Sequence, residues 1–363
     1  MADSAPKVAE AEREEPADVL DEKVDALVKL IQKSKHFIVC TGAGVSTSAG
    51  IADFRGPNGV WTLRAQGKQA HNRKSTLQTI PTPTHMALVE LQNHGILSYL
   101  INFRAVSTYK KSIHDHRTGR NCAICGGILL DTIINFGENL FEEPLRLARK
   151  HAATADLCLV LGSSLTVSPS NEIPETVGRR RGAKLIICNL QSTPIDHLTS
   201  IRIFTKTDNL LTRVMAKLDL PIPSFILRRR LAIQIETGED KRQQLTVRGI
   251  DVDGTPATFL QSVRLDYSRR VVRSEPFVFN LRCPEPGTQM KLELEFMGHY
   301  NEPNLEVQYS YEDGSNTEAH YLLEYNPNDG NWVVTQSETP CLDDSARNEV
   351  TENEKVVIDL TND

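Results

Sequence analysis

A glycine-rich loop at the end of a short apolar run is the feature that most constrains this fold. Residues 36–40 have the character of a buried parallel strand, and Gly42, Ala43 and Gly44 follow almost directly. Glycines here let the backbone turn sharply and approach a phosphate group without a Cβ in the way. Residues 46–48 carry hydroxyls that can cap a helix whose N-terminal amides face an anion. The sequence therefore predicts an α/β domain with a nucleotide-binding loop.

The continuation of the loop makes this pattern specific. A bare Gly-x-Gly fits many ordinary strand-to-helix turns, but here Asp53, Phe54, Arg55 and Trp61 follow it. Residues 41–61 resemble the NAD-binding signature of the sirtuins, or Sir2 family, the NAD-dependent protein-lysine deacylases. The resemblance extends over about residues 19–220 and is strongest to the branch of the sixth and seventh mammalian sirtuins, with the seventh closer. It implies that these four side chains contribute to an NAD site.

Later stretches continue the resemblance in the family's order. Each is an apolar run that ends in small or polar residues, as expected at the carboxyl edge of a parallel sheet, although each alone would also fit a core strand. The resemblance implies that the NAD site is completed by Gly162, Ser163, Ser164, Asn189, Leu190, Gln191 and Asp208. It also implies that a substrate peptide pairs with an edge formed by Ile134, Phe136, Gly137 and Glu138, where it would gain main-chain hydrogen bonds.

An internal segment that the family carries is missing from this chain. Only 27 residues separate His94 from Cys122, and the family's Gln-Asn-x-Asp segment, its Leu-His-Gly turn and its first zinc Cys pair are all absent. Residues 88–101 match the helix and strand before that segment, and the residues from Asn102 onward match the strand after it. Because both edges of the gap are sharp, we favour a skipped exon or an incomplete gene model over an evolved pseudoenzyme.

The gap removes the side chain that the family uses as general base. The resemblance implies that the acyl oxygen attacks C1′ of the NAD ribose, that nicotinamide leaves, and that a His then activates a ribose hydroxyl. His85 lies at the predicted start of a helix, and His94 fits a solvent-facing helix end before Gly95. Neither stands in the matching context. We therefore identify no catalytic residue and expect little or no acyl transfer from lysine to ADP-ribose.

One half of a zinc site is present. Cys122 and Cys125 form a Cys-x-x-Cys pair, whereas structural zinc takes four ligands and no second pair precedes them. His114 and His116 are the local substitutes, at a spacing that is short for such a site. The remaining cysteines before residue 200 suit buried apolar positions: Cys40, Cys158 and Cys188. We expect zinc to be held weakly if it is bound.

A change of pattern divides the chain near the Pro-Ile-Pro at 221–223. Beyond it, apolar and polar residues alternate between Asp-Gly and Pro-Gly turns, as in a β-sandwich. We expect a disordered acidic tail at 1–18, a Rossmann-like parallel-sheet domain at 19–220 with a truncated zinc module at about 102–130, an all-β sandwich-like domain at 225–337, and a second disordered acidic tail at 338–363.

The second tail contains an apolar stretch that could bind a partner. Val356, Val357, Ile358 and Leu360 resemble a SUMO-interacting motif, which adds a strand to the SUMO sheet, although a chance apolar stretch is the alternative. The family resemblance implies acylated-lysine proteins such as histones as partners and a nuclear location, with the nucleolus as one candidate. The net basic body would suit chromatin or RNA as readily as an ordinary solvated surface.

The composition indicates the kind of cellular environment in which this protein folds. Seven cysteines with a single Cys-x-x-Cys indicate a reducing environment, and no apolar run reaches the length of a membrane span. Three functions remain open: a deacylase impaired by the missing segment, a catalytically inactive NAD- or peptide-binding nuclear scaffold, and a misfolded product without a biochemical role.

Overall fold

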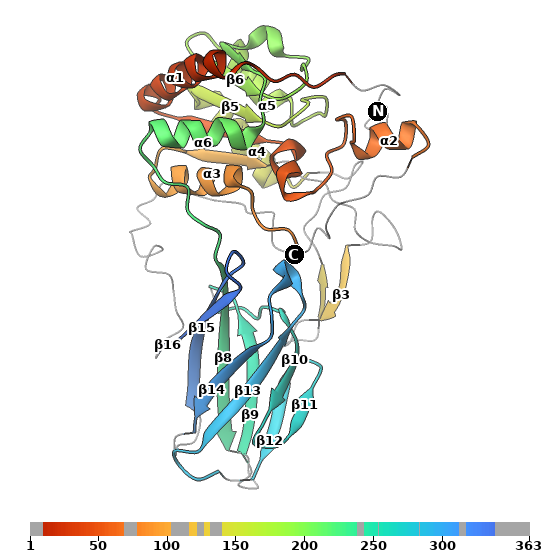
Figure 1. The fold of residues 1–363 in the computed structure, drawn as a ribbon, viewed down its shortest axis with the longest axis vertical. Coiled ribbons are helices and arrows are strands. Elements are labelled where there is room, and N and C mark those ends of the chain that lie inside the picture. Colours follow the sequence, from red (N-terminus) through yellow and green to blue (C-terminus); the bar gives the residue numbers. More distant parts are fainter. Residues whose placement is uncertain are drawn as a thin grey trace. The chain divides into compact units, whose positions relative to one another are not determined.

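Two units of different architecture make up the part of the chain that the computed structural model describes (Figure 1). The described residues are 10–68, 78–102, 116–121, 127–130, 140–237, 243–252, 254–282, 284–311 and 317–337. The first unit holds the described residues up to 116 and those from 140 to 224. The second unit holds residues 225–337 together with the hairpin within 117–130. Each unit is described by itself.

The first unit is built on a five-stranded parallel sheet in the order β2-β1-β5-β6-β7. Its strands are β1 (Phe37–Thr41), β2 (Tyr99–Asn102), β5 (Leu157–Leu161), β6 (Lys184–Cys188) and β7 (Ile201–Ile203). Every residue of β1 and β5 is buried, as expected for parallel strands that are covered on both faces. The prediction of a Rossmann-like α/β domain is confirmed.

Helices cover both faces of this sheet, because successive strand residues point to opposite sides. The helices are α1 (Ala17–Lys33), η1 (Ala43–Ala49), α2 (Val60–Ala65), α3 (Pro83–Asn93), α4 (Glu142–Thr154), α5 (Glu172–Arg179), η3 (Asp196–Leu198) and α6 (Thr207–Lys217). Helices α1, α3 and α6 share one apolar core with Phe37 and Val39, and α4 and α5 share another with Ile38 and Cys40. The carboxyl edge of the sheet is left for the loops.

Helix α1 begins earlier than the sequence indicated. The apolar face of α1 is buried, through Leu20, Val24 and Leu27 among others. The helix starts at Ala17, and the backbone amides of Arg13 and Glu15 donate to carbonyl groups of the first unit. Residues 10–18 of the predicted acidic tail are thus held against the first unit by long-range main-chain hydrogen bonds.

The second unit consists of two antiparallel sheets that share one apolar core, and this confirms the predicted all-β sandwich-like fold. The sheet orders are β11-β10-β13-β14 and β12-β9-β8-β15-β16. The strands are β8 (Leu227–Thr237), β9 (Gln243–Ile250), β10 (Leu260–Leu265), β11 (Arg270–Val272), β12 (Phe277–Leu281), β13 (Gln289–Phe296), β14 (Leu305–Ser310), β15 (Thr317–Asn326) and β16 (Asn331–Ser337), with a short helix η4 (His299–Asn301). Burial alternates strictly along β14, as the sequence pattern predicted.

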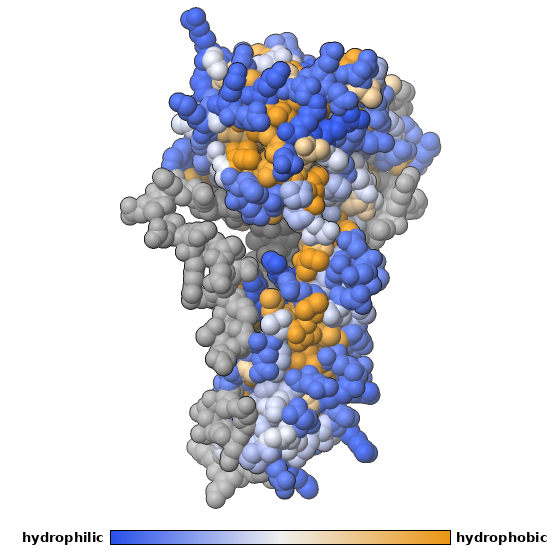
Figure 2. All heavy atoms as spheres, turned by 60° about the vertical axis from the view of Figure 1, so that its left-hand side comes forward, coloured by the Kyte–Doolittle hydropathy of each residue, from blue (hydrophilic) through white to orange (hydrophobic). Residues whose placement is uncertain are grey.

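A small antiparallel hairpin pairs β3 (Arg117–Asn121) with β4 (Ile128–Leu130). Several predicted sites lie outside the described residues: Cys122 and Cys125, His114, the peptide-pairing residues 134–138 and the SUMO-like stretch 356–360. Within the described ranges, no helix combines the length and the apolar character needed to cross a bilayer. Figure 2 shows a mainly hydrophilic face with apolar side chains gathered in patches on both units.

Candidate functional site

A cleft of 1080 Å³ opens at the carboxyl ends of β1, β5 and β6 in the first unit. This is the edge of an α/β sheet where ligands bind. The predicted cofactor residues that line it are Gly42, Ala43, Gly44, Asp53, Phe54, Arg55, Gly162, Ser163, Ser164, Asn189, Leu190, Gln191 and Asp208. Of the residues predicted from the family resemblance to hold NAD, Trp61 does not line the cleft. The structure thus brings the four predicted stretches to one place.

Two glycine loops, residues 42–44 after β1 and residues 162–164 after β5, cross each other with their backbones in contact. The amide of Gly42 donates to Leu161 O at 2.9 Å, and the amide of Gly44 donates to Gly162 O at 2.8 Å. A Cβ on Gly42 would lie 2.6 Å from Gly162 O, and one on Gly44 would lie 2.7 Å from Gly162 Cα. Glycine is therefore required by the packing of one loop on the other. The hydroxyl-rich segment that follows forms the 3-10 helix η1, where the sequence predicted a helix cap.

Asp53 holds the loop that faces the glycines. Its carboxylate accepts a hydrogen bond from the amide of Gly56 at 3.2 Å, and a Cβ on Gly56 would lie 2.4 Å from Asp53 Oδ2. Burial raises the pKa of Asp53, and the hydrogen bond from Gly56 opposes that rise. The backbone oxygen of Asp53 accepts from Val60 N at 2.8 Å, which ties the loop to the start of α2. Asp53 thus organises this wall of the cleft.

Arg55 presents a guanidinium group to the cleft with aromatic support behind it. Its guanidinium carbon lies 4.4 Å from the centre of the Trp61 ring, and the ring of Phe54 lies 4.9 Å from that of Trp61. Arg55 Nη1 donates to Ser164 Oγ at 3.5 Å, and burial lowers the pKa of Arg55. Trp61 is buried beneath this stack. Trp61, predicted to contribute to the NAD site, thus supports Arg55 from behind the wall of the cleft.

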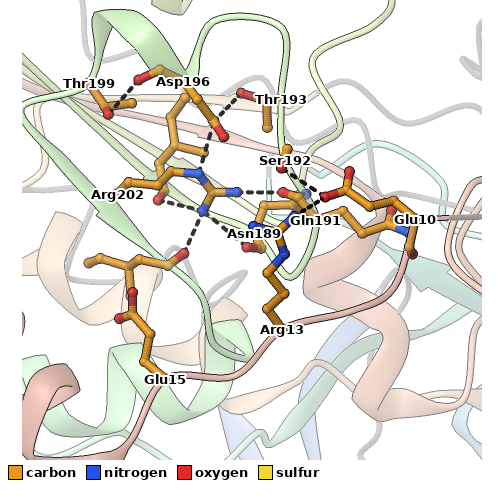
Figure 3. Close-up of polar contacts among 12 residues, drawn as sticks. Glu10, Arg13, Glu15, Asn189, Gln191, Ser192, Thr193, Asp196, Thr199 and Arg202 are labelled. Atoms are coloured by element: carbon orange, nitrogen blue, oxygen red, sulfur yellow. Dashed lines mark hydrogen bonds and ion pairs between the residues drawn. The ribbon is translucent and has the colours of Figure 1, made fainter.

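Asn189, Gln191 and Asp208, which were predicted to hold the cofactor, have hydrogen-bond partners within the protein, and Figure 3 shows Asn189 and Gln191. Asn189 Nδ2 donates to Gln191 O at 2.9 Å, and Gln191 Nε2 donates to Glu10 O at 2.6 Å. Asp208, at the start of α6, accepts from the amide of Thr84 at 2.9 Å and from the Thr84 hydroxyl. This contact caps the first turn of α3. Asn189 and Gln191 were predicted to contribute to the NAD site, and in the structure their side-chain amides fix the loop after β6.

Arg202 holds the loop after β6 in place, and this role was not predicted from the sequence. Its guanidinium donates to Asn189 O at 3.0 Å, to Gln191 O, and through Nε to Asp196 Oδ1 at 2.9 Å. It also lies 3.9 Å from the centre of the Phe204 ring. A charged residue between the two isoleucines of the short strand β7 was the one available signal.

A second feature that the sequence did not reveal is the N-terminal strap, residues 10–16. The strap lies against the loop after β6, and the side chain of Glu12 lines the cleft. Only its acidic composition marked this segment, and acidic composition predicts disorder.

Histidine does not line the described part of the cleft. His85 Nδ1 accepts from the amide of Thr82 at 3.2 Å in a capping arrangement, and the exposed His94 lies 3.0 Å from Glu90. Both positions agree with the structural interpretations made from sequence. Neither residue is placed at the cleft.

The cysteines of the first unit behave as predicted for core residues. Cys40, Cys158 and Cys188 are free and buried. Burial raises the pKa of Cys188 to about 12. The described residues contain no cluster of three His, Cys, Asp or Glu side chains able to hold a metal ion, so they do not fit a zinc site.

The described residues do fit a dinucleotide. The glycines of the crossed loops add no side chains to the cleft, and its lining includes the hydroxyl residues Thr47, Ser48 and Ser163 with the cationic residues Arg55 and Lys206. Hydroxyls, backbone amides and cations are the donors that a diphosphate takes.

Comparison with known proteins supports the same conclusion. A family model described as "Sir2 family" matches residues 91–169. NAD-dependent protein deacetylase SRT1 of Arabidopsis thaliana is 31% identical over 356 residues, covering 80% of this chain and 75% of the relative. NAD-dependent protein deacetylase Sirt6 of Drosophila melanogaster is 32% identical over 253 residues, covering 57% and 79%. NAD-dependent protein deacetylase sirtuin-7 of Homo sapiens is 32% identical over 249 residues, covering 56% and 62%.

A solved structure of a Sir2 protein with a p53 peptide and NAD⁺ matches 54% of this chain and 98% of its own, at 27% identity and a TM-score of 0.42. The match to the Arabidopsis relative is too long to be confined to residues 19–220. The likeness to that relative therefore extends beyond the first unit.

Proposed function

Because this chain belongs to the Sir2 family, we propose that its cleft binds NAD and that it is an NAD-dependent protein-lysine deacylase by family whose own turnover of acyl-lysine is little or none. One observation carries the proposal. The crossed glycine loops, the Asp53–Arg55 segment and the loop after β6 meet around one cleft, in a chain whose relatives are named NAD-dependent protein deacetylases.

The residues of the cleft have distinct roles in this proposal. The glycine loops offer backbone amides and an unobstructed floor, while Arg55 and Ser164 offer side-chain donors to the diphosphate. Asp53 keeps its loop in shape through Gly56. When bound, NAD supplies the ADP-ribose that accepts the acyl group. Trp61 acts through Arg55 and so is a positioning residue.

A second candidate function is binding without turnover, as a nuclear scaffold. It is favoured by the absence of histidine from the described lining and by the missing Leu-His-Gly turn of the sequence. General-base catalysis requires a side chain that titrates near neutral pH close to the proton it removes. A chain with the NAD cleft and without that base would bind the cofactor and an acyl-lysine peptide but would release little product.

Thermal unfolding of the full chain with and without NAD tests the binding function. At 100 times its dissociation constant a ligand stabilises the folded state by about 2.7 kcal/mol, which is readily measured as a rise in Tm. We expect this rise for the wild type and for the exposed-surface control Arg179→Ala, and its loss in Asp53→Ala. A wild-type Tm that does not respond to NAD would refute the proposal and would favour a misfolded product.

Turnover of an acetyl-lysine peptide is measured in parallel. We expect it at or near the blank with the wild type. Robust deacetylation that Asp53→Ala abolishes would show that the chain has a general base and that the scaffold function is wrong.

Further parts of the proposal concern the partners of the protein and residues that lie outside the described ranges. Residues 134–138 would pair with the substrate peptide, Cys122 and Cys125 would hold zinc weakly, and histones or other nuclear proteins would carry the acyl-lysine. Metal analysis of the purified chain tests the zinc site, and a stoichiometry near one per chain would contradict a half site.

The SUMO-like stretch gives the proposal a further partner. Retention on immobilised SUMO should fall when Ile358→Ala and Leu360→Ala are combined, because these side chains would fill the groove beside the added strand. Equal retention of the two proteins would remove this partner. A nuclear location is tested by imaging the tagged full chain.

A further inference from the structure

The N-terminal strap is fixed to the cleft at several points (Figure 3). The amide of Arg13 donates to Leu190 O at 2.9 Å, and Gln191 Nε2 donates to Glu10 O at 2.6 Å. The amide of Glu15 donates to a carbonyl of the first unit at 2.9 Å. These attachments lie on both sides of Glu12. The position of Glu12 is therefore set by the body of the unit.

The strap carries four glutamates, and three of them have partners. Glu10 accepts from Ser192 Oγ at 2.8 Å and pairs with Arg13, Glu14 lies 3.5 Å from Lys206, and Glu15 accepts from Lys23. Glu12 makes no hydrogen bond or ion pair within the described residues, and its side chain lines the cleft. It is thus the strap carboxylate available to a ligand.

Glu12 lies beside the loop after β6, whose residues 189–191 were predicted to belong to the NAD site. Leu190, whose carbonyl receives the neighbouring Arg13 amide, follows Asn189 and precedes Gln191. The amides of both flanking residues are used within the protein. A sugar bound beside this loop therefore meets the carboxylate of Glu12 as the free acceptor, and the charges that act on this carboxylate are those of Asp53, Lys206 and Glu14.

We propose that Glu12 is a cofactor-specificity residue, whose carboxylate accepts a hydrogen bond from a ribose hydroxyl of NAD and repels the 2′-phosphate of NADP. This inference rests on the proposed NAD-binding function. In α/β dinucleotide folds an acidic residue performs this task from the chain after a sheet strand, and an arginine in its place accommodates the phosphate. Here the acid is supplied by the segment that precedes the first helix.

Because Glu12 is exposed, the preference for NAD over NADP should depend on the salt concentration. The side chain lies at the mouth of the cleft and is exposed, so its repulsion of a phosphate acts through solvent. The preference for NAD over NADP should therefore shrink as ionic strength rises. A preference that came from shape alone would not respond to salt.

Binding of NAD and NADP to the full chain by titration calorimetry tests the proposal, with four proteins compared. The wild type should prefer NAD. Glu12→Gln should bind NAD about three- to tenfold more weakly, because a charge-assisted hydrogen bond becomes a neutral one, and should lose most of the discrimination. Glu12→Arg should prefer NADP. The matched control Glu175→Gln makes the same chemical change on α5, outside the lining of the cleft, and should keep the wild-type ratio of affinities.

The outcomes separate this inference from the function on which it rests. A wild type that binds neither nucleotide overturns both. A wild type that binds NAD, with an NAD-to-NADP ratio unchanged in both Glu12 variants, overturns the role of Glu12 and leaves the cleft function standing. A Glu12→Arg protein that unfolds at the wild-type temperature but gains no affinity for NADP also counts against the proposal.

Discussion

Replacing Arg202 should destabilise the first unit strongly, because one side chain holds the loop after β6 through several bonds. The side chain of Arg202 is 13% exposed. Its loss removes the guanidinium donor from Asn189 O and Ile187 O, whereas Ile203 O, Gln191 O and Asp196 Oδ1 each keep a second partner. Breaking a largely buried charged network costs about 3–5 kcal/mol, and the retained partners place Arg202→Met near the lower end, about 3 kcal/mol. Arg202→Lys should lose less, since an ammonium group replaces some of the donors.

Tryptophan fluorescence gives a clean assay of this loss, because the chain has two tryptophans and each unit holds one. In a Trp332→Phe background, Trp61 reports urea unfolding of the first unit alone, and linear extrapolation gives its free energy. For a unit of this size, about 3 kcal/mol corresponds to a Tm lower by about 6–12 °C. The affinity for NAD should also fall, because Arg202 holds the backbone of Asn189 and Gln191 at the cleft.

The control for this experiment is Arg179→Ala. Arg179 forms an exposed pair with Glu175 on α5, and such pairs contribute at most about 1 kcal/mol. A loss below about 1 kcal/mol for Arg202→Met, equal to that of the control, would refute the reasoning that the buried guanidinium network supports the loop.

Three further substitutions or treatments probe single contacts. Gly44→Ala should cost about 1–3 kcal/mol and weaken NAD binding, since its Cβ would lie 2.7 Å from Gly162 Cα; unchanged urea unfolding of Trp61 would contradict this. Burial raises the pKa of Glu302 above its ordinary value of 4.5. The second unit therefore loses stability as the pH rises from 4.5, the value in the unfolded chain, through the higher pKa of the folded state. Glu302→Gln should therefore raise the Tm of this unit at pH 7 and leave it unchanged at pH 3, and equal effects at both would be evidence against a buried carboxyl. Cys188, with a pKa of about 12, should react with a thiol reagent only after urea unfolding, and rapid reaction of the native chain would contradict its burial.

The fold class could be predicted because it depends on local patterns. The run at Leu157–Leu161 is buried at every position, and the alternation in Leu305–Ser310 matches burial residue by residue. These are properties of one strand and its two faces, which a sequence states directly. The meeting of the glycine loops could also be predicted, since carboxyl ends of parallel strands share an edge.

The detailed use of side chains at the cleft could not be predicted in the same way. Whether Gln191 binds a ligand or a neighbour depends on Glu10, which is 181 positions away and whose acidic context favours disorder. Trp61 likewise changes from a lining residue to a support because Arg55 lies over its ring. The first outcome is set by a contact between segments distant in the chain, and the second by the conformation of the loop between Arg55 and Trp61.

The sheet topology explains how this chain can keep a nucleotide cleft without the family's catalytic segment. Strand β2 pairs with β1 from Ile38–Tyr99 through Thr41–Asn102, so the edge strand is complete up to the junction at Ile101–Asn102. Within the described residues, the two glycine loops and the loop that carries Asn189 follow β1, β5 and β6, whereas β2 contributes Tyr99, Leu100 and Ile101 to the lining of the cleft. The missing segment therefore begins at an edge of the sheet and takes no glycine loop with it. Binding of NAD and removal of a proton are separated by their places in the topology, and retention of the first with loss of the second is the result that this architecture predicts.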